Sequence, residues 1–203
     1  MSVRNVEIDF EFMNTIAAPP KGVEQMYQQA CSNDQATVNH WRGTWLSQIE
    51  ANKKKYGPFK DRSLQSLFGA ADKKPVIVAG AGPSLRYNID QLATVKDIHI
   101  VSCLHNYHYM TDKNVKVDYY VSLDAGTVTL PEVSEGGERT PEEYWETTKD
   151  KTLLAFVGSN PELLNSWKGD IKFFGCPIPE DSAMKAVMEI EEFNNWVSTG
   201  GNV

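Results

Sequence analysis

The stretch Pro75-Val-Ile-Val-Ala-Gly-Ala-Gly-Pro-Ser-Leu85 decides the fold of this chain. Its apolar run, Val76–Ala79, is typical of a short buried strand. Gly80-Ala81-Gly82 follows at once, and glycine lets the backbone approach a ligand closely because it carries no side chain. Pro83 suits the first position of a helix, where its missing N–H costs nothing. A strand, a glycine turn and a helix start together place unpaired N–H groups where an anion can bind, so the stretch predicts a phosphate-bearing ligand.

Downstream of this stretch, strand and helix patterns alternate. Thr140-Pro141 has a capping box with proline at the first helical position, and Asn160-Pro161 repeats the device. Alternation of this kind predicts an α/β fold, a Rossmann-like and mostly parallel sheet flanked by helices, over residues 74–203. The candidate strands are Val76–Ala79, Ile98–Cys103, Val117–Leu123, Leu153–Val157 and Ile171–Phe174.

Residues 1–73 have a different pattern and predict a mainly helical extension. Residues 6–12 alternate apolar and acidic side chains, which predicts a strand with one solvated face. Residues 23–56 show apolar side chains at three- and four-residue spacing, which predicts a long helix that Gly57-Pro58 ends. Leu64–Ala71 predicts a shorter helix with its apolar residues on one face.

Composition excludes several classes of protein. The chain has 203 residues and a formal net charge of −7, which argues against a nucleic-acid-binding surface. Three scattered cysteines, Cys31, Cys103 and Cys176, favour a reducing compartment. No apolar run approaches the length of a membrane span, so we expect no membrane partner and a cytoplasmic protein.

The C-terminal residues 198–203 look like a turn that leads into another helix. A doubly wound fold usually continues with more strands, so we expect this fold to be truncated at its C-terminus. An incomplete sheet exposes an edge strand, which predicts pairing with a second copy as a homodimer.

The glycine turn does not match two well-known phosphate-binding motifs. Leu85 stands where the dinucleotide fingerprint has its third glycine, and no acidic residue ends the second strand, which argues against NAD. No Gly-Lys-Ser/Thr is present, so the turn is not a P-loop. Two interpretations remain open: a tight structural turn, or a phosphate site in which Ser84 donates its hydroxyl to the phosphate or simply caps the helix.

Polar residues follow the second predicted strand. Asn106 can pair with a base edge or a sugar hydroxyl near the carboxyl ends of the strands, where open α/β sheets bind ligands. His105 and His108 can be acid/base groups or metal ligands, and the competing interpretation is local packing in an aromatic loop.

The sequence contains two further candidate ligand-binding sites. Asp124 ends the third predicted strand, where it can bind Mg²⁺, accept a hydrogen bond from a hydroxyl, or cap a loop. Gly200, Gly201 and Asn202 offer free amides for a second anion- or sugar-binding turn, and the alternative is a flexible chain end.

The order Gly-x-Gly-Pro-Ser-Leu, then Ser-Leu-Asp, then Gly-Gly-Asn-Val resembles the MptE-like 6-hydroxymethylpterin diphosphokinase family, which includes the bacterial motility accessory factors. The Gly-Pro-Ser-Leu turn is also similar to that of sialyltransferases that use CMP-sialic acid. The resemblance implies that Asp124 is the family's acid and that a set of turn and loop residues binds the nucleotide: Gly80, Ala81, Gly82, Pro83, Ser84, Asn106, Gly200, Gly201 and Asn202.

The expected function is therefore that of a nucleotide-dependent transferase whose partner is a small nucleotide or nucleotide-sugar. The first hypothesis is a glycosyltransferase that uses a CMP-activated nonulosonic sugar, with Asp124 as the catalytic residue. The second is an ATP-dependent diphosphokinase acting on a hydroxymethylpterin, with Mg²⁺ held partly by Asp124. A third, from another class, is a non-catalytic nucleotide-binding or interaction module.

Overall fold

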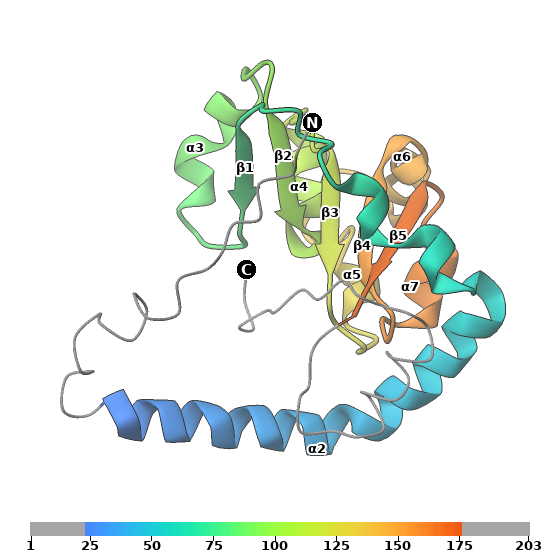
Figure 1. Ribbon diagram of the computed structural model, residues 1–203. Helices are drawn as coiled ribbons and strands as arrows, with labels where there is room; N and C mark the ends of the chain where they lie inside the picture. Colours follow the sequence, from blue (N-terminus) through green and yellow to red (C-terminus); the bar gives the residue numbers. More distant parts are fainter. Residues whose placement is uncertain (1–22, 176–203) are drawn as a thin grey trace. The chain divides into compact units, whose positions relative to one another are not determined.

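The structure of the protein is a computed structural model that describes residues 23–175 (Figure 1). Its centre is a five-stranded parallel sheet in which the strands stand side by side in chain order. Each strand lies within two residues of a predicted one, so the α/β prediction is confirmed. The strands are β1 (Val76–Ala79), β2 (His99–Cys103), β3 (Tyr119–Ser122), β4 (Thr152–Phe156) and β5 (Asp170–Phe174).

Short helices connect the strands and cover one face of the sheet. Because parallel crossovers are right-handed, a sheet whose strands follow each other in one direction receives all its connecting helices on the same face. Figure 1 shows α4 to α7 behind the sheet. The connecting helices are α3 (Leu85–Leu92), η3 (Leu104–Asn106), α4 (Tyr107–Asp112), α5 (Thr129–Glu132), α6 (Pro141–Thr147), η4 (Thr148–Asp150) and α7 (Pro161–Ser166).

The described part of the region before the sheet, from residue 23 onward, is mainly helical, as the sequence predicts. Helix α2 spans Val23–Tyr56, and two 3₁₀ helices follow, η1 (Phe59–Arg62) and η2 (Leu64–Leu67). The chain divides into two compact units, residues 1–40 and residues 41–203, and the second unit contains all the described strands. The strand predicted at residues 6–12 lies outside the described residues.

The α-helix predicted over Leu64–Ala71 is wrong. Four of these residues form η2, and Phe68, placed on the buried face by the prediction, is 74% exposed. Gly69 follows with φ +81°, a left-handed conformation that glycine adopts without steric cost and that a continuing helix excludes. The spacing of three that suggested an α-helix is equally that of a 3₁₀ turn.

Much of the core lies between the sheet and its connecting helices, and Ile49 of α2 and Phe59 of η1 add to it. Alternate residues of β2, β3 and β4 point to this side and are buried, among them Ile100, Tyr120 and Leu153. Tyr107 from α4 packs on Tyr120 with ring centroids 4.7 Å apart, and Trp167 meets both rings edge-on. Apolar side chains that alternate along strands thus fix which face receives the helices.

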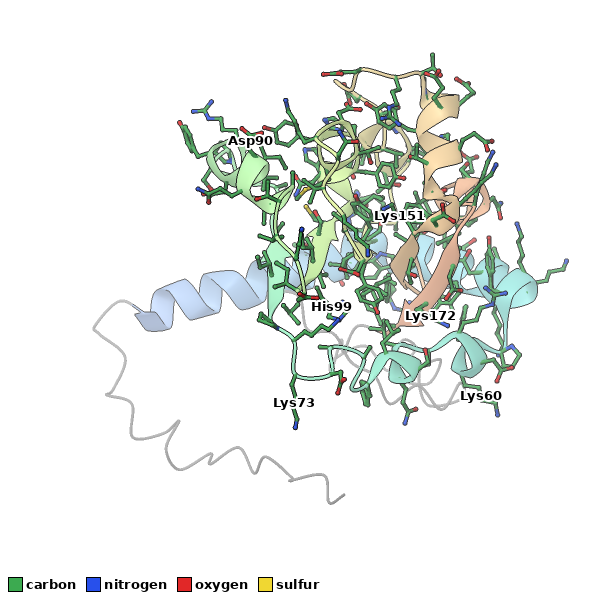
Figure 2. The ribbon with its side chains drawn as sticks, turned by 90° about the horizontal axis from the view of Figure 1, so that it is seen from above. Lys60, Lys73, Asp90, His99, Lys151 and Lys172 are labelled. Atoms are coloured by element: carbon green, nitrogen blue, oxygen red, sulfur yellow. The ribbon has the colours of Figure 1, made fainter. Side chains whose placement is uncertain are left out.

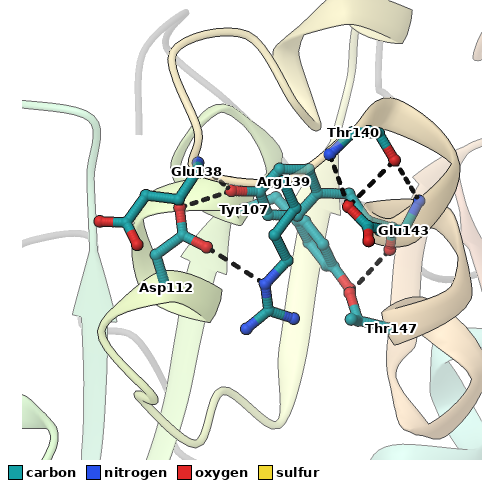
Figure 3. Close-up of polar contacts among 8 residues, drawn as sticks. Tyr107, Asp112, Glu138, Arg139, Thr140, Glu143 and Thr147 are labelled. Carbon is teal, nitrogen blue, oxygen red and sulfur yellow. Dashed lines mark hydrogen bonds and ion pairs between the residues drawn. The ribbon is translucent and has the colours of Figure 1, made fainter.

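The predicted capping devices are present. Thr140 Oγ1 accepts a hydrogen bond from the backbone N–H of Glu143, whose carboxylate accepts one from the N–H of Thr140 in return. Figure 3 shows this box beside a second polar group, in which Tyr144 donates to Asp112 and Arg139 pairs with the same carboxylate at 3.5 Å. These contacts fasten the start of α6 to the end of α4.

In the described part of the chain, no helix is both long and apolar enough to cross a bilayer.

Candidate functional site

The glycine turn connects β1 to α3 and lies open to solvent. Ala81, Gly82, Pro83 and Ser84 are all exposed. Within the turn, the N–H of Leu85 donates to the carbonyl oxygen of Gly82 at 3.1 Å. Among the described residues, the backbone N–H groups of Ala81, Gly82 and Ser84 have no acceptor. Donors without partners at the start of a helix are the groups that bind an anion.

Helix α3 begins two residues later than predicted. Pro83 precedes the helix in a turn, and Ser84 stands at the N-cap position in the right-handed helical region with φ −69°. An N-cap hydroxyl accepts from the helix when its residue is extended, and here the Ser84 side chain makes no capping hydrogen bond. The interpretation of Ser84 as a cap is therefore wrong, and its hydroxyl stays exposed beside the open N–H groups.

Gly82 has no structural need to be glycine. Its φ is not in the left-handed region, and a Cβ built there would meet only Ser84 Oγ, at 3.7 Å, which is an ordinary contact. Gly69, by contrast, needs glycine for its positive φ. A glycine with neither conformational strain nor crowding leaves room in front of the backbone, as a closely bound ligand requires.

Asn106 is hydrogen-bonded to the start of this turn. The residue is 6% exposed, and its amide nitrogen donates to Gly80 O at 3.1 Å, to Ser102 Oγ at 3.2 Å and, at 3.4 Å, to Ala79 O. Both amide N–H donors are thus spent on the protein. Asn106 acts on the site by positioning the turn, and a direct ligand contact stays a prediction for its carbonyl oxygen alone.

Asp124 lies two residues beyond the end of β3 and is exposed. Its Oδ1 accepts a hydrogen bond from the N–H of Gly126 at 2.7 Å, and Thr129 Oγ1 donates to the Gly126 carbonyl oxygen at 2.9 Å. One carboxylate oxygen therefore caps a local turn. The other has no partner among the described residues and remains available for a ligand.

Glu132 lies beside His105 and His108, although no sequence pattern predicts it as a site residue. Its carboxylate lies 3.5 Å from His105 Nδ1, and its carbonyl oxygen lies 3.4 Å from His108 Nδ1. Burial raises the pKa of Glu132, while the adjacent His105 opposes the shift. The two histidines predicted together are thus connected through one residue of α5, which only the folded chain reveals.

The described residues give little support for a bound metal ion or a reactive thiol at this site. No three His, Cys, Asp or Glu side chains in the described ranges gather as ligands for an ion. Asp124 fits Mg²⁺, which is often held by one or two carboxylates together with substrate phosphates. Burial raises the pKa of the Cys103 thiol, which keeps it in the less reactive protonated form.

Helix α2 contacts the loops at the carboxyl ends of β3 and β4, at the same edge of the sheet. Gln48 Nε2 donates to the carbonyl oxygen of Ala125, and Asn52 Nδ2 donates to those of Val157 and Ser159, each at 2.9 Å. Both side chains thus bind the loops that follow β3 and β4. The glycine turn after β1 and Asn106 after β2 lie at the part of this edge to which neither side chain binds.

Gly200, Gly201 and Asn202 lie outside the described residues, so the predicted second glycine turn stays a prediction. The other predicted residues stand at the ends of three adjacent strands. The turn follows β1, Asn106 follows β2 and Asp124 follows β3.

Comparison with known proteins gives one family. The family model described as "6-hydroxymethylpterin diphosphokinase MptE-like" matches residues 47–203, more than three quarters of the chain. No curated protein matches. A solved structure titled "Structure of MAf glycosyltransferase from Magnetospirillum magneticum AMB-1" is similar at 18% identity and a TM-score of 0.38, covering 51% of this chain and 16% of that one. This chain spans about a sixth of that protein's length.

Proposed function

Since the chain belongs to the MptE-like 6-hydroxymethylpterin diphosphokinase family, we propose that it is a nucleotide-dependent transferase that binds its nucleotide phosphate on the turn Gly80–Ser84. The observation that best supports the proposal is that the protein itself does not use the polar groups of this turn. It offers exposed N–H groups without acceptors, an uncommitted serine hydroxyl and a glycine that the fold does not need. Each feature is unexplained by packing and is what a bound phosphate requires.

The charge of the turn favours a donor with a single phosphate. Residues 75–85 contain no lysine or arginine. The next cation, Arg86, has its guanidinium over the ring of Tyr87 at 4.7 Å and donates to that hydroxyl. Neutral N–H and hydroxyl donors suit the one phosphate of a CMP-activated sugar, whereas a triphosphate carries more charge than this turn can offset. We therefore place a CMP-activated nonulosonic sugar first among the donors.

In this mechanism the turn and Asp124 have separate roles. The bond between the sugar's anomeric carbon and the phosphate oxygen breaks as the acceptor hydroxyl attacks, and CMP leaves. Negative charge grows on the departing phosphate, where the fixed N–H groups of the turn and the Ser84 hydroxyl stabilise it. The free carboxylate oxygen of Asp124 takes the acceptor's proton. Asn106 contributes by keeping the turn in place.

A second candidate is the diphosphokinase that the family's description names. Here Asp124, with its uncommitted oxygen, is the described residue that would hold Mg²⁺. The bound metal would neutralise charge on the phosphates during transfer. The turn Gly80–Ser84 keeps the same phosphate-binding role in both candidates.

Calorimetric titration distinguishes the candidates. Binding of CMP without metal supports the glycosyltransferase, and binding of ATP only with Mg²⁺ supports the diphosphokinase. Gly82→Ala should weaken nucleotide binding at least tenfold, because its methyl group occupies the phosphate's place, while thermal stability changes little. Gly43→Ala is the matched control, since a Cβ there meets nothing within 4 Å and the residue lies in α2, away from the turn in sequence.

Two results would count against the proposal. If neither nucleotide binds, the turn is structural and the proposal fails. If CMP or ATP binds but no transfer to any hydroxyl acceptor occurs, and Asp124→Asn leaves binding unchanged, the chain is a nucleotide-binding module rather than an enzyme.

A further inference from the structure

His105 and Glu132 form a carboxylate–histidine pair that the mechanism above does not use. His105 Nδ1 lies 3.5 Å from Glu132 Oε1, and the two residues come from η3 and α5. The His105 side chain is 63% exposed. Ion pairs with an exposed member contribute little to stability, so folding alone does not account for the pair. A carboxylate that orients an imidazole ring is an arrangement used in acid–base catalysis.

His105 follows the strand that lies between the two strands whose ends the proposed function already uses. The glycine turn follows β1, His105 follows β2 and Asp124 follows β3. The residue next to His105, Asn106, donates to Gly80 O at 3.1 Å. Burial raises the pKa of Glu132 and the charge of Asp124 adds to this shift, so the two carboxylates lie near each other. The pair is therefore close to the phosphate-binding turn on one side and to Asp124 on the other.

The orientation of the His105 ring leaves one nitrogen for a ligand. Because Nδ1 faces the Glu132 carboxylate, Nε2 lies on the opposite edge of the ring. When the ring is protonated, both nitrogens are donors, so it pairs with Glu132 and still offers an N–H at Nε2. The exposure of the side chain allows a substrate to reach this nitrogen.

A proton donor at this place supplies what the glycine turn lacks. The segments at the ends of β1, β2 and β3 are residues 79–84, 103–106 and 122–126, and His105 is the one side chain in them that can carry positive charge. The N–H groups of the turn and the Ser84 hydroxyl are neutral donors, so they stabilise the charge on a departing phosphate without removing it. A protonated imidazole removes that charge by giving up its proton.

We propose that His105 is a second catalytic residue, which donates the Nε2 proton to the departing phosphate, and that Glu132 is the positioning residue that holds its ring. This inference rests on the proposed function, because it requires a nucleotide phosphate on the turn Gly80–Ser84.

The step balances with the role given to Asp124. The bond between the anomeric carbon and the phosphate oxygen breaks, its electron pair stays on that oxygen, and the oxygen takes the proton from His105 Nε2. The acceptor oxygen bonds to the anomeric carbon while Asp124 takes its proton. One proton thus leaves the acceptor and one reaches CMP, and exchange with water returns both side chains to their starting states.

Release of CMP from CMP-sialic acid by the full chain measures this step with water as the acceptor. His105→Gln should lower kcat about a hundredfold and leave KM unchanged, because the proton moves only in the transition state. His105→Ala should lose the same activity and regain about fivefold when imidazole is added, which a merely structural role does not allow. Glu132→Gln should lower kcat about tenfold at unchanged KM, because the ring is then less well oriented.

His99 provides the matched control. Its Nδ1 also lies 3.5 Å from a carboxylate oxygen, that of Asp118, but His99 begins β2 at the opposite end of the sheet, the end nearer the viewer in Figure 2. His99→Gln therefore removes an equivalent pair away from the turn. It should leave kcat and KM unchanged, and added imidazole should have no effect on it.

Calorimetric titration with CMP and with cytidine tests the contact without turnover. CMP carries the phosphate as it is after departure, and cytidine has no phosphate. His105→Gln should weaken CMP binding about tenfold, because a charge-assisted hydrogen bond to the phosphate is lost. Cytidine binding should not change, and His99→Gln should bind both compounds as the wild type does.

The results separate this inference from the proposed function. If the wild type binds and releases CMP and His105→Gln does the same, the role of His105 is overturned and the proposed function stands. Equal losses of CMP and cytidine binding, or a loss of activity with a raised KM and no rescue by imidazole, assign His105 to the structure of the site and overturn the inference. If the wild type binds no CMP, or releases none from the donor, both fail.

Discussion

Replacing Asn106 by aspartate tests how the glycine turn is held. The two side chains have nearly the same size, so packing is preserved. The amide nitrogen that donates to Gly80 O at 3.1 Å and to Ser102 Oγ at 3.2 Å becomes a carboxylate oxygen, which donates nothing. Because the residue is only 6% exposed, water cannot replace the lost donors.

The magnitude follows from the groups left without partners. A buried acceptor that loses its donor costs about 1–3 kcal/mol, and a buried carboxylate facing the Gly80 carbonyl oxygen adds its own desolvation. We expect a loss of roughly 2–4 kcal/mol in the free energy of unfolding at neutral pH. For a chain of this size, each kcal/mol lowers Tm by about 2–4 °C, so Tm should fall by roughly 5–15 °C.

The loss should depend on pH in a defined direction. Burial and the facing carbonyl oxygen raise the pKa of the new carboxyl group, because both disfavour its charged form. The protonated acid donates one hydrogen bond, so the deficit is smallest below the ordinary pKa of aspartate. It grows as pH rises through the raised pKa.

Differential scanning calorimetry at pH 4 and pH 8 measures both effects. Asn114→Asp is the control, since Asn114 is exposed and has a positive φ of 56°, which aspartate also tolerates. An Asn106→Asp protein with the wild-type Tm at both pH values would refute the reasoning. A deficit equal at both pH values would show that lost packing, rather than the lost donor, is responsible.

Three further substitutions have defined outcomes. Gly169→Ala should destabilise the chain by several kcal/mol, because the new Cβ collides with the backbone oxygen of Lys151, and urea unfolding measures the loss. Tyr144→Phe removes the hydroxyl that donates to Asp112 at 2.5 Å, so the unfolding free energy should fall by about 1–3 kcal/mol. Burial raises the pKa of Glu132, so the wild type loses stability as pH rises through that pKa. Glu132→Gln should therefore have a higher Tm than the wild type at pH 8 and an equal one at pH 4; a lower Tm at pH 8 would mean that its pairing with the neighbouring histidine outweighs burial.

The strands were predictable because their signal is local. Each strand is an apolar run between turn residues. The capping residues Thr140 and Asn160 also give a local signal, because each binds a backbone N–H only a few residues further along the chain. The start of α3 was not predictable to the residue, because Pro83 suits both the first helical position and the turn before it.

The contacts within the candidate site join residues that lie far apart in the sequence, so no spacing pattern predicts them. Asn106 reaches back 26 residues to the Gly80 carbonyl oxygen, and Glu132 meets His105 from another helix. Sequence patterns identify residue types at strand ends, where ligands bind. They do not show whether a side chain faces the ligand or the protein, because burial decides that only after the chain has folded.

The order of the strands has a consequence for how the protein is made. Each described strand from β2 to β5 pairs with the strand that was synthesised immediately before it. As the chain leaves the ribosome, each new strand therefore finds its neighbour already complete, and the sheet can grow in one direction from its N-terminal strand. Contacts between the segment before β1 and β5, such as those of Tyr56 and Ser63 with Phe173, form last. They bring the earliest and latest parts of the unit together only when the fifth strand is in place, and so act as the final step of assembly.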